Sequence, residues 1–143
     1  MRIKDIVESK DIEGVVTIRP DATVRDLLAL LAEQNIGALV VSRDGQQVDG
    51  IVSERDVVRQ LHANDAVLDE SVESIMTSTV HTCPPDADLD AVMTEMTERR
   101  IRHVPVVGPD GLTGLVSIGD VVKHKISVLQ FERDQLDSYV HQT

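Results

Sequence analysis

The chain has 143 residues, enough for one compact domain or two very small ones. It carries 25 acidic against 14 basic residues, a net charge of −11, and its aromatic residues are one Tyr, one Phe and no Trp. Proteins that hold nucleic acids rely on basic surfaces and, for single strands, on aromatic stacking, so this composition speaks against nucleic-acid binding. Hydrophobic residues make up 41% of the chain, which suits a packed aliphatic core rather than a disordered acidic tail.

The sequence also indicates where in the cell the protein is located. No apolar run approaches the ~20 residues that a membrane span requires. The first residues, Met1–Asp5, lack the apolar region of a secretory signal. The single Cys83 cannot form an internal disulfide. We therefore expect a cytoplasmic protein with no membrane partner.

An internal repeat organises the chain. The segment Gly50–Val58 recurs as Gly114–Val122 with six of nine residues identical, and Thr17–Ala22 recurs upstream as Thr82–Ala87. Short similar segments precede both halves: Ile3-Lys4-Asp5-Ile6-Val7, and Val72-Glu73-Ser74-Ile75-Met76. We call these segments the lead-ins. The repeat predicts three parts: residues 1–66, residues 67–126 and a C-terminal helical tail over 127–143.

The first half has the predicted order strand, helix, strand, turn, strand, helix. The helix has an apolar face at helical spacing, its cap is Asp21 or Thr23, and Gly37 ends it. The turn carries Asp-Gly, a hairpin signal. In chain order the elements are the strand Val15–Ile18, the helix face Val24, Leu27, Leu28 and Leu31, the strand Leu39–Val41, the turn Asp44-Gly45, the strand Ile51–Val52, and a helix from Ser53 through Leu61.

The second half repeats this order. Its first helix has the apolar face Leu89, Val92, Met93 and Met96, with Asp86 or Asp88 as the cap, and is followed by the strand Val104–Val107 and the turn Asp110-Gly111. One unit of this size is too small to be comfortably stable alone. We therefore predict an α/β fold of the α+β type, in which two pseudo-symmetric β-α-β-β-α repeats pack through their sheets and share one core.

The tail continues the last helix beyond the repeat. Its apolar and polar residues recur at spacings of three and four: Ile126, Leu129, Gln130, Arg133, Leu136 and Val140. Both aromatic rings of the chain, Phe131 and Tyr139, lie here. The pattern favours equally a helix that covers a flank of its own chain and one that contacts a partner subunit.

The segment Gly-h-h-Ser-x-x-Asp, where h is hydrophobic, lies at a strand-to-helix junction in both halves. Ser53 and Ser117 take the N-cap position, with Asp56 and Asp120 three residues later, which is the pattern of a capping box. A structural cap explains the pattern by itself. A second interpretation is a nucleotide site: the helix N-terminus and hydroxyl would hold a phosphate, and the carboxylate would accept ribose hydroxyls.

Three motifs that occur in order, twice, give the chain a resemblance to a known family. They are a Thr-x-x-Pro opening (Thr17/Pro20 and Thr82/Pro85), the strand Arg102-His103-Val104-Pro105-Val106-Val107, and the two Gly-h-h-Ser-x-x-Asp segments. The repeat resembles the cystathionine β-synthase (CBS) domain, and two in tandem resemble a Bateman module. The resemblance covers residues 1–126 and is that of a stand-alone bacterial CBS-domain protein.

The resemblance implies two clefts that bind adenine-containing ligands, with AMP or ATP favoured, and no required cofactor. In one cleft Asp120 would hold a ribose and Ser117 a phosphate, flanked by Leu115 and Gly119. Its adenine wall would comprise Thr17, Ile18, Ile36, Gly37 and Ala38. The mirror cleft would use Asp56, Ser53, Ile51 and Arg55, with Thr82, Cys83, Ile101, Arg102 and His103 on its adenine side.

The two clefts are not expected to be equal. Gly37 and Ala38 are small and leave room for a base, whereas their counterparts Arg102 and His103 are bulky. The resemblance also implies that Arg102 and His103 approach the phosphate of the Asp120 cleft. We therefore expect the Asp120 cleft to bind more tightly.

The predicted function is a non-catalytic sensor that acts as a homodimer and is read by an unidentified regulated protein. The alternative is a protein-interaction module with unoccupied clefts. An enzyme is the weakest hypothesis, because neither a G-x-S-x-G elbow nor a P-loop is present. Five histidines (62, 81, 103, 124 and 141) show no metal-ligand spacing.

Overall fold

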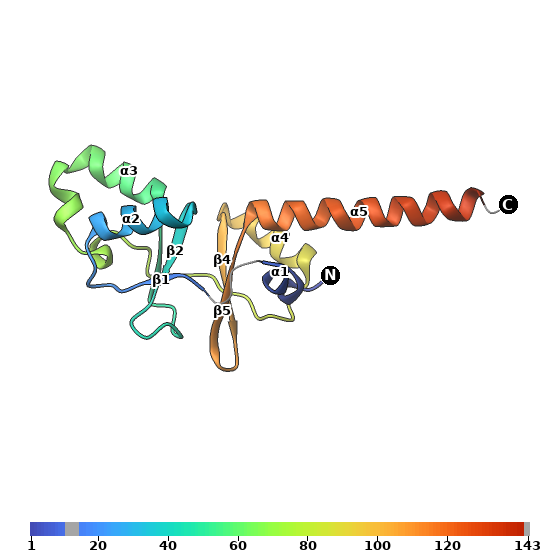
Figure 1. Ribbon diagram of the computed structural model, residues 1–143, viewed down its shortest axis with the longest axis horizontal. Helices are drawn as coiled ribbons and strands as arrows, with labels where there is room; N and C mark the ends of the chain where they lie inside the picture. Colours follow the sequence, from blue (N-terminus) through green and yellow to red (C-terminus); the bar gives the residue numbers. More distant parts are fainter. Residues whose placement is uncertain (11–14, 142–143) are drawn as a thin grey trace.

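The computed structural model describes residues 1–10 and 15–141. Two αβ halves lie side by side, and the last helix projects far beyond them (Figure 1). The elements, in chain order, are α1 (Ile3–Ser9), β1 (Thr17–Ile18), α2 (Val24–Gln34), β2 (Ala38–Val41), β3 (Gly50–Ser53), α3 (Glu54–Ala63), the 3-10 turns η1 (Asp65–Asp69) and η2 (Val72–Ser74), α4 (Leu89–Arg99), β4 (His103–Gly108), β5 (Gly111–Ser117) and α5 (Ile118–His141).

The first half is built on a three-stranded sheet. β2 lies in the centre, parallel to β1 and antiparallel to β3. Side chains alternate along β2: Leu39 and Val41 enter a core with Leu27 of α2 and Val57 of α3. Val40 is also fully buried but is not part of that core. Both faces of β2 are therefore covered, as packing through the sheets predicts.

The second half is built on the β4–β5 hairpin. Its strands pair antiparallel from His103 opposite Ser117 to Gly108 opposite Gly111. A first strand corresponding to β1 is reduced to one parallel bridge between Cys83 and Val106. The order predicted for the first half is thus confirmed, and the second half keeps it except for this shortened strand.

Each lead-in packs against the other half of the molecule. Ile3 and Ile6 of α1 are fully buried in a second core, with Val92 of α4 and Val116 of β5. The η1 and η2 turns place Val67, Val72 and Ile75 in the first core.

The prediction that the two repeats share one core is therefore wrong. Each sheet has its own helices on one face and a borrowed lead-in beside them, so two separate apolar clusters form. The exchange of lead-ins ties the two halves together in place of a common core.

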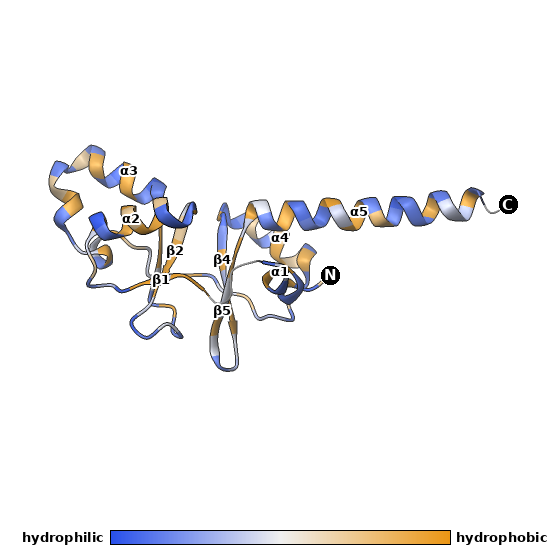
Figure 2. Cartoon of the chain, in the orientation of Figure 1, coloured by the Kyte–Doolittle hydropathy of each residue, from blue (hydrophilic) through white to orange (hydrophobic). Residues whose placement is uncertain are grey.

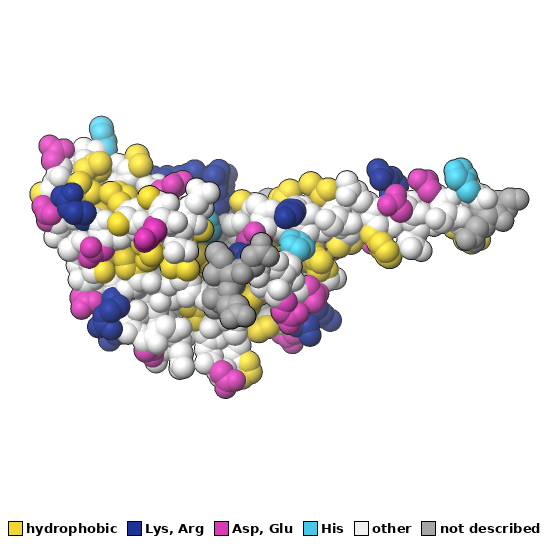
Figure 3. All heavy atoms as spheres, viewed as in Figure 1, with side chains coloured by type: hydrophobic (Ala, Val, Ile, Leu, Met, Phe, Trp, Pro, Cys, Tyr) yellow, Lys and Arg dark blue, Asp and Glu magenta, His cyan; other side chains and the backbone are white. Residues whose placement is uncertain are grey.

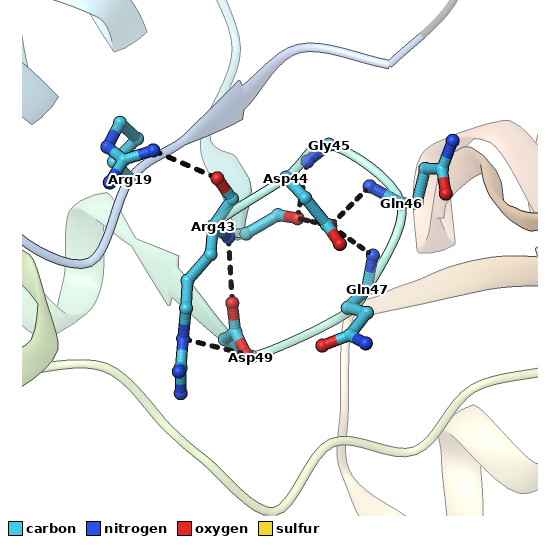
Figure 4. Close-up of polar contacts among 8 residues, drawn as sticks. Arg19, Arg43, Asp44, Gly45, Gln46, Gln47 and Asp49 are labelled. Carbon is cyan, nitrogen blue, oxygen red and sulfur yellow. Dashed lines mark hydrogen bonds and ion pairs between the residues drawn. The ribbon is translucent and has the colours of Figure 1, made fainter.

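A loop of the first half also rests on the second. Residues 42–49 are held in shape by carboxylates: Asp44 Oδ1 accepts hydrogen bonds from the N–H groups of Gln46 and Gln47, at 2.9 and 2.8 Å (Figure 4). These two bonds lower the pKa of Asp44. The Gln46 carbonyl then accepts a hydrogen bond from Leu112 N, at 2.9 Å, which docks the loop on the β4–β5 turn.

The structure shows which of the candidate residues cap the first helix of each half. Thr23 caps α2 and Asp88 caps α4 through their side chains. The expectation that Gly37 ends the first helix is wrong: Asn35 takes the left-handed conformation there, at φ 53°. Asn tolerates this conformation better than most residues, so glycine is not required. In the described residues, no helix is long and apolar enough to cross a membrane.

Gly111 and Gly45 give a matched test of the loop docking. Both have positive φ, at 114° and 81°. A Cβ on Gly111 would lie 3.0 Å from the Gln46 carbonyl oxygen, whereas one on Gly45 meets no described atom within 4 Å. We expect Gly45→Ala to cost ~1 kcal/mol of unfolding free energy and Gly111→Ala up to ~3 kcal/mol. Urea unfolding measures both, and equal losses would show that the docking adds nothing.

Candidate functional site

The two Ser-x-x-Asp segments form the predicted capping boxes at the starts of α3 and α5. The Asp56 N–H donates to Ser53 Oγ (3.3 Å), and the Ser53 N–H donates to Asp56 Oδ2 (2.8 Å). The equivalent bonds between Ser117 and Asp120 measure 3.1 and 2.9 Å. The boxes hold both carboxylates at strand-to-helix junctions, next to helix N-termini whose partial charge favours anions.

A cleft of about 590 Å³ lies beside the Asp120 junction. It brings together Asp120, Ser117 and Leu115 from the second half with Ile36, Gly37 and Ala38 from the first, and His103 also lines it. The remaining lining residues come from α1, the segment between α1 and β1, the C-cap of α2 and β5: Val7, Glu8, Lys10, Val15, Val16, Asn35, Thr113 and Gly114.

A smaller cleft of about 230 Å³ lies beside the Asp56 junction. It contains Ser53, Asp56 and Ile51 from the first half. The opposite wall comprises Thr77, Thr79, Val80, His81, Arg100, Ile101, Arg102 and His103. The difference in volume agrees with the small side chains of Gly37 and Ala38 in one wall and the large ones of Arg102 and His103 in the other.

Four residues predicted for the Asp120 cleft do not line it. Ile18 is buried in the first core, and Thr17 pairs with Val40 within the sheet. Gly119 has no side chain to offer and lies on the exposed first turn of α5. Arg102 lines the smaller cleft instead. Of the two side chains Arg102 and His103 expected at the Asp120 cleft, His103 lines it, and it lines the smaller cleft as well.

Three residues predicted for the Asp56 cleft also lie outside its lining. Arg55 is exposed on the first turn of α3, Thr82 is exposed before the Cys83 bridge, and Cys83 is buried in the second core. Arg100 and Arg102 supply the positive charge of this cleft. Arg55, which the resemblance implied for this cleft, is thus not among its lining residues.

Lys10 is a residue of the larger cleft that sequence reasoning missed. Its Nζ donates to the Leu115 carbonyl at 2.6 Å and forms an ion pair with Asp120 Oδ2 at 2.8 Å. Lys10 follows the first lead-in at the same spacing as Thr79 follows the second, and each lines a cleft. The equivalent positions of Lys10 and Thr79 could have been recognised from the repeat of the lead-ins. That Lys10 lies beside Asp120, however, follows from the packing of each lead-in against the other half.

Lys10 also sets the charge of the site. Burial raises the pKa of Asp120, but the hydrogen bonds from Lys10 Nζ and Ser117 N–H outweigh it, so the pKa lies below its ordinary value. Burial lowers the pKa of His103, against the opposing charge of Asp120. Near neutral pH the larger cleft therefore presents a carboxylate, an ammonium and a neutral imidazole.

Cys83 is not available for chemistry in the folded protein. It is 5% exposed, and burial, aided by the charge of Glu95, raises the pKa of its thiol to about 11. Since the thiolate is the nucleophile, Cys83 acts in this fold as a small apolar core residue and not as a reactive group.

Comparison with known proteins identifies the architecture. The model of the CBS domain matches residues 3–63 and again residues 72–127. The chain belongs to the CBS-domain family. The CBS-domain protein ATU1752 from Agrobacterium tumefaciens is 37% identical, with a TM-score of 0.81 over 87% of this chain and 99% of that one. The chain is thus similar to CBS pairs along most of its length.

Two further relatives bear on the comparison. The mitochondrial CBS domain-containing protein CBSX3 of Arabidopsis thaliana is 36% identical over 84% of this chain, and the match spans 61% of that relative's length. The CBS domain pair of MJ0100 was solved in complex with 5-methylthioadenosine and S-adenosyl-L-methionine. It is 25% identical, with a TM-score of 0.75 over 86% of this chain and 98% of that one.

The Lys10–Asp120 pair predicts a pH-dependent stability. The folded state binds the Asp120 proton less tightly than the unfolded chain, so the stabilisation is present near neutral pH. It is lost as pH falls through the folded-state pKa. Lys10→Met keeps the aliphatic stem and should lower the unfolding free energy at pH 7 by up to ~1 kcal/mol.

Urea unfolding at pH 7 and at the most acidic pH at which the chain still folds measures this effect, because Asp120 takes up its proton as the pH falls toward its lowered folded-state pKa. The gap between Lys10→Met and the unmodified chain should shrink in acid. Lys4→Met, at an exposed position on α1, is the control. A gap of constant size at both pH values would contradict the assignment.

Proposed function

We propose that the chain is a non-catalytic regulatory module that binds an adenine nucleotide, AMP or ATP, in the larger cleft. The observation that carries the proposal is Asp120: its carboxylate is fixed at a helix N-terminus and faces a cleft of about 590 Å³ lined by both halves. That volume lies in the range of small-molecule sites. The methylthioadenosine and S-adenosylmethionine complex of the related MJ0100 pair supports the ligand class.

The geometry of Asp120 suits a ribose. Its contacts with Ser117 N–H and with Lys10 Nζ both use Oδ2. Oδ1 can therefore accept the two ribose hydroxyls without breaking either contact, and hydrogen bonds to a charged acceptor are the stronger kind. In this proposal Asp120 selects a cis-diol, and Lys10 keeps the carboxylate ionised.

The rest of the cleft suits a flat base and a phosphate at opposite ends. Gly37 and Ala38 leave space at one wall, and Ile36 and Val16 provide aliphatic surface for a base without an aromatic ring. The N-terminus of α5, with Ser117 Oγ and Lys10, offers donors for a phosphate. We propose that this cleft binds more tightly than the smaller one.

We also propose that the module acts as a homodimer whose state is read by a regulated protein. Exposed apolar side chains lie on α3 (Val58, 67% exposed, and Leu61) and on the first turns of α5 (Val122 and Ile126). Exposed apolar side chains on both helices offer surface that a second copy could bury. A ligand that binds one arrangement of the two halves better would shift their packing, which a partner could sense.

A thermal-shift screen with AMP, ATP, NADH and S-adenosylmethionine tests the ligand class. A ligand present at 100 times its dissociation constant should stabilise the fold by ~2.7 kcal/mol. No stabilisation by any of these ligands would favour an interaction module with unoccupied clefts. Turnover of a ligand would favour an enzyme.

Asp120→Asn and Asp56→Asn separate the clefts by calorimetry with the strongest ligand. Both changes keep an oxygen that can accept the capping hydrogen bond but replace the other oxygen with an NH2 donor, so each removes the charge and the acceptor proposed for the ribose hydroxyls. We expect Asp120→Asn to weaken binding at least tenfold and Asp56→Asn to leave the tighter site unchanged. The opposite result would assign the tighter site to the smaller cleft.

A further inference from the structure

The outer half of α5 is a helix that its own chain does not cover. α5 spans Ile118–His141, and its buried residue, Val121, belongs to the first turn. Farther out, Leu129 is 50% exposed, Leu136 and Phe131 are 65% exposed, and Tyr139 is 71% exposed. Figure 1 shows this part extending away from both halves. The tail therefore does not cover a flank of its own chain in this structure, which favours the subunit contact.

The apolar residues of α5 follow a seven-residue repeat. From Val122 the positions advance by alternating steps of four and three to Ile126, Leu129, Arg133, Leu136 and Val140. This is the a/d spacing of a coiled coil, in which a narrow apolar seam faces another helix. Figure 2 shows hydrophobic turns recurring along α5, and Figure 3 shows hydrophobic side chains along its surface. A helix with such a seam is stabilised by a helical partner.

The charges of α5 indicate what that partner is. Lys123 and Lys125 lie in its inner half, whereas Glu132, Asp134 and Asp137 lie in its outer half. A second copy in the antiparallel direction would bring the basic inner half against the acidic outer half, twice by symmetry. A parallel copy would instead place Arg133, a seam residue, opposite itself.

We propose that α5 pairs antiparallel with α5 of a second copy along the seam from Val122 to Val140. The alignment that keeps the whole seam within the pair places Ile126 opposite Leu136 of the other copy. It also places Lys123 opposite Asp137, while Lys125 already pairs with Asp90 of its own chain at 2.8 Å. This pairing rests on the homodimer proposed above. It specifies α5 as the helix in the interface and the antiparallel orientation of the two copies.

Light scattering of the full chain tests the seam. The unmodified chain should have twice the 15.7 kDa mass of one chain at micromolar concentrations. Leu129→Glu with Leu136→Glu should give a monomer, and Phe131→Glu, equally exposed but off the seam, should leave a dimer. A monomeric unmodified chain would overturn both the homodimer and the pairing. A double variant that stays dimeric would overturn the pairing alone.

Disulfide trapping in a Cys83→Ala background tests the direction. With oxidised glutathione as oxidant, a mixture of Ile126→Cys and Leu136→Cys chains should form a mixed disulfide, while each variant alone should not cross-link. Cross-linking of either variant alone would indicate a parallel pair and overturn the proposal. Lys123→Asp should weaken the dimer at least fivefold, and adding Asp137→Lys should restore it. No recovery would overturn the alignment.

Nucleotide binding gives an independent control. The residues changed on α5 line neither cleft. Loss of the dimer with calorimetric binding intact would support the pairing as a feature separate from the ligand site. Failure of every variant and of the unmodified chain to bind nucleotide would count against the proposed function without touching the pairing.

Discussion

The Asp120 carboxylate joins the junction of β5 and α5 to the end of α1, which lies near the other end of the sequence. It accepts a hydrogen bond from Ser117 at the end of β5, starts α5, and pairs with Lys10 at the end of α1. The capping box fixes the position of the carboxylate, and the hydrogen bonds from Lys10 and Ser117 outweigh the effect of partial burial and lower its pKa. Because a neutral carboxyl would lose its preference for hydroxyl donors, the ligand chemistry proposed for the cleft depends on this contact.

The exchange of lead-ins makes that contact possible. α1 carries Ile3 and Ile6 into the core of the second half, and Lys10 follows at the rim of the cleft. The walls of the cleft thus come from both halves and from the segment that crosses between them. The loop at residues 42–49 adds a second bridge, through Gln46 and Leu112. A ligand held by all these walls would favour one packing of the halves over others, which is what a sensor needs.

Local signals predicted much of this structure. The repeat, the capping boxes and the Asp110-Gly111 turn can be recognised directly in the sequence, and the structure confirms each of them. Asp44-Gly45 lies instead within the longer loop of residues 42–49, which joins the antiparallel strands β2 and β3. The contrast between Gly37-Ala38 and Arg102-His103 also predicted which cleft is larger, because the size of a side chain in a cleft wall directly limits the volume of that cleft.

The errors arose where long-range packing decides. Each lead-in packs its apolar face against the sheet of the other half, and the local sequence of α1 does not specify which sheet it will cover. This exchange produced two cores in place of one and put Lys10 beside Asp120. Arg102 lines the smaller cleft, as one of its two predicted positions required, but it does not reach the larger cleft, and Arg55 lines neither. The direction of a long side chain near a strand or helix end depends on its neighbours in space, which local sequence does not give.

A crystal structure of the chain grown with AMP tests the central claim most directly. The account predicts density for the nucleotide in the larger cleft, with ribose hydroxyls within hydrogen-bond distance of Asp120 Oδ1 and with the Lys10–Asp120 Oδ2 contact kept. Nucleotide bound solely in the smaller cleft, or a ribose remote from Asp120, would contradict it.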